Sequence, residues 1–217
     1  MKKQILIALL AACLAPAARA TVAYNVSLNT TPLIGHVAGP FSIDLQLVGD
    51  QGSTVTVSLI TFGGGSPAGL PNCFGNCSGD LSTAVSMNAA SGFLNEFYQT
   101  FTPGASLMFS VTFGNIVPPP VGGPSSPDAF SFAILDSTLS EIPMLAGNGS
   151  FLTVTLDNAL TPSILVNSND PSGTPAIGLI GAPAVAPSGV PEPAHTGVAG
   201  LVILLAAANW RNRLFVA

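Results

Sequence analysis

The chain has 217 residues, of which ten are acidic and five basic, so its formal net charge is −5 at pH 7. The bases all lie near the two ends: Lys2, Lys3, Arg19, Arg211 and Arg213. Between residues 21 and 190, nine acids and no bases give a charge of −9. Such a body repels phosphate, which excludes nucleic-acid binding. A hydrophobic content of 48% also argues against a disordered chain.

The first 20 residues have the three regions of a secretory signal peptide. These are the basic Lys2 and Lys3, the apolar residues 5–12 and the small-residue site Ala18-Arg19-Ala20. Cleavage after Ala20 makes Thr21 the mature N-terminus. An alternative is a lipobox at residues 10–13, in which Cys13 becomes a lipidated first residue. Two-chain acylation there would anchor the protein by itself.

Residues 21–170 are predicted to form an all-β ectodomain. Apolar and polar residues alternate, as in half-buried strands, over 41–47, 54–59, 107–113, 130–134 and 152–156. Turn-forming residues separate these runs at 48–52, 102–104 and 118–127. Short strands with Gly and Pro between them predict an antiparallel β-sandwich, or a jelly-roll-like one.

Residues 93–101 fit two patterns. The apolar positions Phe93, Leu94, Phe97, Tyr98 and Phe101 match the stripe of a helix as well as a strand. We predict a strand, because residues 99–104 lead directly into the next β run.

Cys73 and Cys77 lie four residues apart in the loop 71–79 and are the only cysteines after residue 20. In an exported protein this spacing predicts a local disulfide, with Gly75 allowing the bend. A metal-binding pair is the alternative, but only His36 in the body is available to help complete a site. We predict no metal and no other cofactor.

The sequence predicts no catalytic residue. A Ser-His-Asp triad would have to use His36, yet no Gly-x-Ser-x-Gly motif is present. Paired carboxylates of a glycosidase are an alternative that the scattered acids support weakly. Alternation predicts that Asp44 faces outward. Four other acids fall in predicted turns, without the spacing of a calcium loop: Asp50, Asp80, Asp128 and Asp170.

Residues 171–189 are rich in proline and glycine and carry no charge. This composition predicts a partly extended linker. Packing of Ile177, Leu179 and Ile180 onto the domain is the alternative.

Residues 190–213 have the order of a sorting tail. They begin with Val190-Pro191-Glu192-Pro193, a segment that its prolines keep extended. Residues 194–210 carry no charge and, as a helix, would be about 25 Å long, near the short limit for crossing a bilayer. Trp210 then lies at the interface, and Arg211 and Arg213 form a cytoplasmic stop. A buried C-terminal helix is disfavoured because no polar face is present.

This tail closely resembles the PEP-CTERM sorting signal of Gram-negative bacteria. The resemblance implies export through the inner membrane and cleavage of the tail by an exosortase. The tail differs from the family pattern in that residues 214–217 follow a cluster of only two arginines. Residues 91–113 and 127–132 are similar to an uncharacterised β-rich ectodomain family of PEP-CTERM proteins, which implies a β-sandwich without an established activity.

The resemblance implies a non-enzymatic protein of the cell surface or matrix, associated with exopolysaccharide or biofilm. The expected partners are the exosortase, the inner membrane before processing, and exopolysaccharide or another glycan. A secreted carbohydrate-binding module is the first alternative, with Tyr24 and Tyr98 as its stacking residues. A secreted hydrolase is the second.

Overall fold

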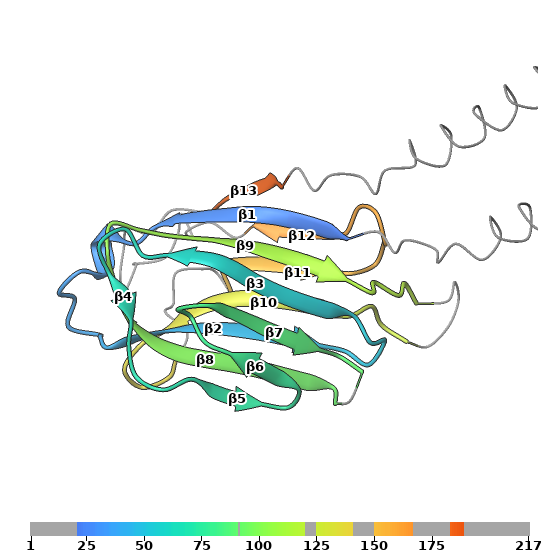
Figure 1. Cartoon of the computed structure of the whole chain (residues 1–217), viewed down its shortest axis with the longest axis horizontal. Helices are drawn as coiled ribbons and strands as arrows, with labels where there is room; N and C mark the ends of the chain where they lie inside the picture. Colours follow the sequence, from blue (N-terminus) through green and yellow to red (C-terminus); the bar gives the residue numbers. More distant parts are fainter. Residues whose placement is uncertain (1–20, 91, 120–124, 141–149, 167–182, 189–217) are drawn as a thin grey trace, which may run out of the picture. The chain divides into compact units, whose positions relative to one another are not determined.

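The computed structural model describes residues 21–90, 92–119, 125–140, 150–166 and 183–188. These residues form two antiparallel sheets that face each other (Figure 1). The all-β fold predicted from alternation is therefore confirmed. In the described part of the chain, no helix has the length and apolar character needed to cross a membrane.

The strands divide between the two sheets as follows. Sheet A contains β1 (Val22–Asn29), β3 (Thr54–Thr61), β6 (Cys77–Gly79), β7 (Ala84–Asn88), β9 (Ser106–Gly114) and β13 (Ala184–Pro187). Sheet B contains β2 (Phe41–Val48), β4 (Ser66–Pro67), β5 (Asn72–Phe74), β8 (Leu94–Thr102), β10 (Ala129–Leu135), β11 (Leu152–Thr155) and β12 (Ser163–Val166). A short 3-10 turn, η1 (Thr31–Leu33), follows β1.

The strands pair in a nested pattern. Sheet A has the order β13-β1-β9-β3-β7-β6, and sheet B the order β12-β11-β10-β2-β8-β4, with β5 also paired to β8. Thus β1 pairs with β9, β2 with β8, and β3 with β7. Because β5 belongs to sheet B and β6 to sheet A, the hairpin between them joins the sheets along one side.

The core lies between the sheets and is rich in phenylalanine. Phe109 of sheet A meets Phe132 of sheet B with ring centroids 5.1 Å apart, and Phe113 meets Phe130 at 5.6 Å. Phe132 is fully buried. Aromatic pairs with this edge-to-face geometry add stability beyond the area that they bury.

The strands predicted by alternation are all present, as β2, β3, β9, β10 and β11. The strand prediction for residues 93–101 is confirmed by β8, whose alternate residues Phe97 and Phe101 are buried. Strands β1 and β7 lie in segments for which the sequence led to no prediction. Their alternating burial is as regular as that of the predicted strands.

Part of the linker predicted for residues 171–189 belongs to the fold, since residues 184–187 form a strand. Strand β13 pairs with β1, from Tyr24 opposite Pro187 to Ser27 opposite Ala184. Val185 packs partly buried against the core. Pro187 is tolerated because β13 is an edge strand. Residues 167–182, and with them Ile177, Leu179 and Ile180, lie outside the described residues.

Asp128 holds the turn between β2 and β3. Its side chain is fully buried, and its two carboxylate oxygens accept the backbone N–H groups of Gln51 and Ser53, each at 2.9 Å. Gly49 has φ +140°, and a Cβ at this position would overlap the Asp128 carboxylate. The turn at 48–52 therefore depends on an acid far along the chain.

Candidate functional site

The outer face of sheet A is covered by small neutral polar side chains. Side chains alternate between the two faces of a strand, so residues that neighbour core positions point outward. We call this set the hydroxyl face: Asn25, Ser27, Thr54, Thr56, Ser58, Ser78, Ser86, Asn88, Ser110 and Thr112. Five strands contribute to it.

The strand register arranges the hydroxyl face in rows. Ser78 lies opposite Ser86, which lies opposite Thr56. Thr56 in turn lies opposite Thr112. Four hydroxyl side chains therefore follow one another across four strands at intervals of about 4.8 Å. Alternation in the sequence indicates a polar side for each strand, but only the register shows that these sides form one surface.

Two shallow hollows lie on this surface. The first has a volume of about 390 Å³ and is lined by residues of β1, β3, β9 and β13, among them the exposed Leu59 and Met108. The second, which we call the polar cleft, has a volume of about 300 Å³ and lies over β3, β6 and β7. Its polar lining residues are Thr54, Thr56, Asn76, Ser78, Ser86 and Asn88.

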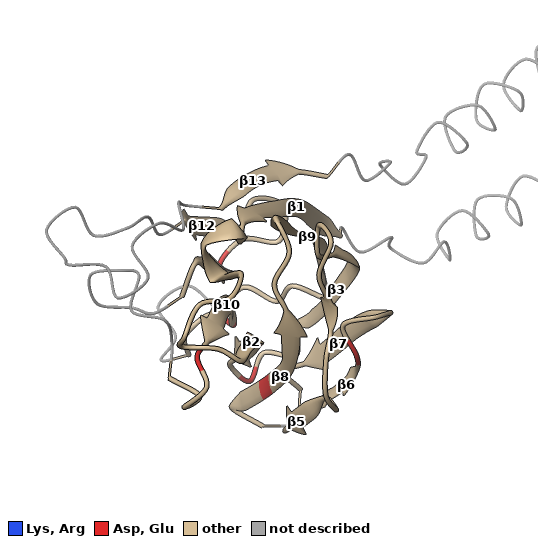
Figure 2. Ribbon diagram, turned by 90° about the vertical axis from the view of Figure 1, so that its left-hand side faces the viewer, with Lys and Arg blue, Asp and Glu red and all other residues tan. Residues whose placement is uncertain are grey.

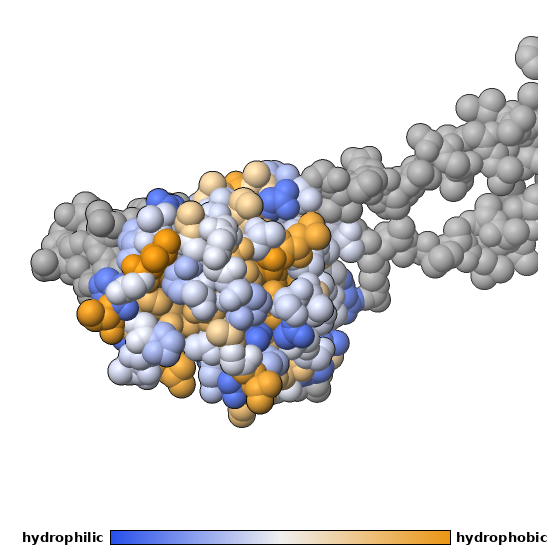
Figure 3. Space-filling model, turned by 60° about the vertical axis from the view of Figure 1, so that its left-hand side comes forward, coloured by the Kyte–Doolittle hydropathy of each residue, from blue (hydrophilic) through white to orange (hydrophobic). Residues whose placement is uncertain are grey.

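Charged groups are absent from the described strands of sheet A. The only acids in described strands are Asp44 of β2 and Glu96 of β8, both in sheet B. Figure 2 shows the few acidic positions of the described chain and no basic one. The space-filling view shows mostly pale residues, broken by separate apolar patches (Figure 3). The hydroxyl face therefore fits an uncharged ligand better than an ionic one.

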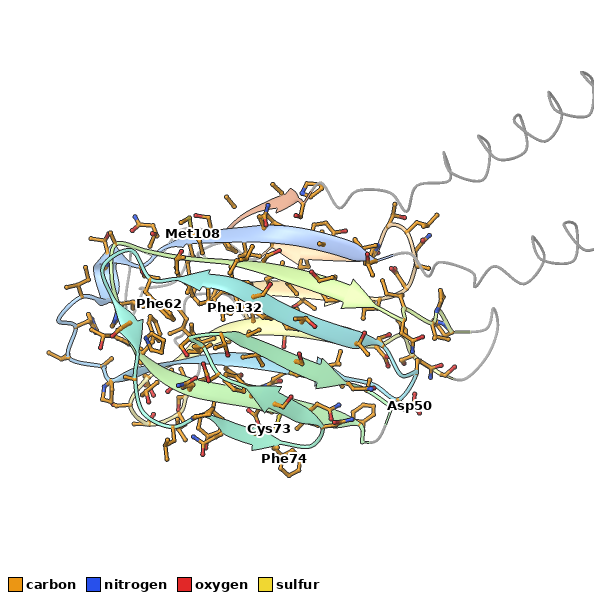
Figure 4. All side chains as sticks on the ribbon, viewed as in Figure 1. Asp50, Phe62, Cys73, Phe74, Met108 and Phe132 are labelled. Atoms are coloured by element: carbon orange, nitrogen blue, oxygen red, sulfur yellow. A yellow bond between two sulfur atoms is a disulfide. The ribbon has the colours of Figure 1, made fainter. Side chains whose placement is uncertain are left out.

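Cys73 and Cys77 are joined by a disulfide, with Cα atoms 5.7 Å apart. Cys73 lies in β5 and Cys77 in β6, so the cross-link lies where the two sheets meet. Gly75 has φ +80°, and a Cβ there would lie 2.6 Å from the carbonyl oxygen of Leu94. Phe74 points away from the sandwich (Figure 4). No group of three or more metal-ligating side chains occurs among the described residues.

Two buried amides on β8 hold this side of the sandwich, and no pattern in the sequence indicates their role. Asn95 Oδ1 accepts the N–H of Asn76 at 2.7 Å. Gln99 Oε1 accepts the N–H of Leu81 at 2.9 Å, and its Nε2 donates to the carbonyl of Gly69 at 3.2 Å. Both side chains therefore tie loops next to the disulfide hairpin to sheet B.

Asp44 faces outward from the core, as alternation predicts, but it is buried, with only 2% of its surface exposed. It lies on the outer face of sheet B, with Tyr98 opposite it on one neighbouring strand and Ala133 on the other. Gln46 Nε2 donates to Asp44 at 2.9 Å and to Glu96 at 3.4 Å. One amide thus brings two carboxylates close together, as in paired-acid catalysis. The burial of Asp44 keeps it from a substrate in solution.

His36 takes part in a local turn. Its Nδ1 accepts the backbone N–H of Ala38 at 3.1 Å, and its ring centroid lies 6.3 Å from that of Phe41. Within the described residues, no serine or acidic side chain bonds to this imidazole. The triad alternative therefore receives no geometric support.

Hydroxyl groups hold three exposed turn aspartates. The donors are Ser82 for Asp80, Thr138 for Asp136 and Ser163 for Asp157. These hydrogen bonds lower the pKa of each carboxyl because they favour its charged form. The folded state therefore gains stability that is complete above the ordinary pKa of 3.8 and is lost as the pH falls through the lower folded value.

The Ser82→Ala variant should raise the pKa of Asp80 toward its ordinary value of 3.8, since the Ser82 hydroxyl is the largest cause of the lowering. NMR titration of the side-chain carboxyl carbons measures this shift. The pKa of Asp136, in a separate turn, should stay lowered and serves as the control. An unchanged Asp80 titration would show that the hydroxyl does not hold the carboxylate in solution.

The residues predicted to direct sorting fall outside the described part of the chain. They are the signal-peptide residues Ala18 and Ala20, and the tail residues Val190, Pro191, Glu192, Pro193, Trp210, Arg211 and Arg213. Thr21 is the first described residue. Comparisons with protein-family models, with curated proteins and with solved structures found no match. Function must therefore be inferred from the residues themselves.

Proposed function

We propose that this chain is an exported, non-enzymatic protein of the cell surface or extracellular matrix that associates with exopolysaccharide. The observation that carries the proposal is the hydroxyl face, an uncharged surface of Ser, Thr and Asn side chains on sheet A. Hydroxyl groups donate and accept hydrogen bonds, as the hydroxyls of a sugar do. The nested strand pairing supports the finer assignment of a jelly-roll-like sandwich.

The proposal includes the route of export. The signal peptide of residues 1–20 directs the chain across the inner membrane, and residues 194–210 hold it there. An exosortase then recognises Pro191-Glu192-Pro193, and the ectodomain passes to the cell surface. The support for this route is the order of the motifs in the sequence.

A carbohydrate-binding module in its own right is the second candidate, and the polar cleft favours it. Of its two expected stacking residues, Tyr24 is buried against Phe113, which leaves Tyr98. A hydrolase is less well supported, because Asp44 of the paired acids is buried.

Co-sedimentation with exopolysaccharide from the producing cells tests the proposal. The full chain, purified in detergent, should sediment with the polysaccharide and should release no new reducing ends from it. If the wild type does release reducing ends and a Glu96→Gln variant does not, the protein is a hydrolase instead. Failure to sediment with any polysaccharide would reject the association.

A further inference from the structure

The polar cleft gathers hydroxyl and amide groups from three neighbouring strands and one turn. Thr54 and Thr56 come from β3, Ser86 and Asn88 from β7, and Ser78 from β6. Asn76 adds the turn before β6. Apart from these groups, the lining consists of Val55 and Met87, which belong to the core. The cleft is therefore polar without being charged.

Several of these hydroxyls have hydrogen-bonding capacity to spare. Within the described part of the chain, the side chains of Thr56, Ser78 and Ser86 make no hydrogen bond to protein. They stand side by side in one row of the register. Each can donate one hydrogen bond and accept two. A ligand that spans the row therefore meets three adjacent groups of mixed donor and acceptor character.

The charges around the cleft limit the ligand. Asp80, just beyond β6, is the acid nearest in sequence, and its carboxylate is engaged by Ser82 and Thr83. No lining residue is acidic, so the cleft offers a cation no carboxylate. No lining residue is basic, so it offers a phosphate or uronate no counter-charge. The remaining match is an uncharged polyol.

The wall formed by β6 is held in place before a ligand arrives. The disulfide closes the hairpin, and Asn95 Oδ1 accepts the N–H of Asn76. Across the cleft, the N–H of Asn88 donates to the carbonyl oxygen of Asn76 at 3.0 Å. A preformed wall reduces the ordering that binding would otherwise require.

We infer that the polar cleft binds uncharged sugar units of a polysaccharide through the row of Thr56, Ser86 and Ser78. This inference rests on the proposed association with exopolysaccharide and names its site and ligand class. The expected ligand is a neutral glycan. Because no ion pair would form on binding, the affinity should not depend on the salt concentration.

The test measures binding of the full chain in detergent to immobilised neutral polysaccharides (dextran, β-glucan and galactomannan) and to alginate as an anionic probe. Thr56→Val and Ser86→Ala remove one hydroxyl each with little change in shape. Each should weaken binding to the neutral probe about two- to ten-fold, with the larger loss in the double variant. Added salt should not change the affinity.

Ser131→Ala and Thr153→Val are matched controls, since they remove paired hydroxyls from sheet B. They should leave binding unchanged, and unfolding midpoints should show that all variants are folded. If the wild type binds neutral polysaccharide and the cleft variants bind equally well, the inferred site is wrong while the proposed function stands. Binding of the wild type to alginate alone would likewise overturn the inferred site and leave the proposed function standing. Binding to no polysaccharide would overturn both.

Discussion

Replacing Asp128 with alanine is expected to lower the free energy of unfolding by about 3–5 kcal/mol. The carboxylate is fully buried and accepts two backbone N–H groups, from Gln51 and Ser53. A hydrogen bond to a charged group contributes about 1.5–3 kcal/mol, and alanine leaves both donors without this partner. Because small domains are stable by only about 5–15 kcal/mol, this change removes a large part of the total.

Urea denaturation followed by circular dichroism measures the Asp128→Ala effect. Asp50→Ala is the matched control, because the exposed Asp50 side chain accepts a hydrogen bond from the neighbouring Gln51 amide and from no other described residue. This control should change stability by less than about 0.5 kcal/mol. A small effect at both positions would mean that the turn between β2 and β3 keeps its shape without the carboxylate.

Changing Pro191-Glu192-Pro193 to three alanines is expected to abolish processing of the C-terminal tail while the sandwich stays folded. The two prolines keep this segment extended, and Glu192 is the only charged residue between Asp170 and Arg211. Without the motif, residues 194–210 should hold the chain in the inner membrane, with Arg211 and Arg213 on the cytoplasmic side. Cell fractionation and immunoblotting distinguish the retained long form from the released short form.

A variant with alanine in place of Pro171 and Pro175 serves as the control for the tail experiment. It removes two linker prolines and leaves the sorting motif intact. Normal processing is expected of it. If the triple-alanine variant reaches the surface at normal size and rate, the tail is a simple membrane anchor rather than a sorting signal.

The strands were predictable because alternation is a local property. In β2, β3 and β9 most of the apolar positions two residues apart are buried. Leu59, predicted to alternate with Val55 and Val57 on the inner side of β3, is instead 76% exposed, because the register shifts between Ser58 and Thr61 and Leu59 has φ +55°. Alternation was less informative about what covers each face. Asp44 occupies the outer face of sheet B as expected, yet neighbouring strands and side chains bury it. The sequence predicts linker where β13 forms, because Ala and Pro residues give no alternation signal, and pairing with β1 decides the structure of this segment.

In the candidate site, too, the sequence predicts the local pattern, and only the folded structure shows which residues become neighbours. Ser and Thr at alternate positions of single strands are ordinary polar sequence. They become rows of adjacent hydroxyls only when the register places Thr56 beside Ser86 and Thr112. Asn95 and Gln99 have the pattern of ordinary strand residues, and their roles appear only when the loops at Asn76 and Leu81 reach them.

The sequence by itself determined the all-β class, six of the strands (β2, β3, β8, β9, β10 and β11) and the absence of bases from the body. Only the tertiary structure decided the order of the strands, the hydroxyl face and its cleft, and the buried acids. The physical reason is distance along the chain. Alternation repeats every two residues, whereas the hydrogen bond between Gln51 and Asp128 joins residues 77 apart, and such contacts follow from how the whole chain packs.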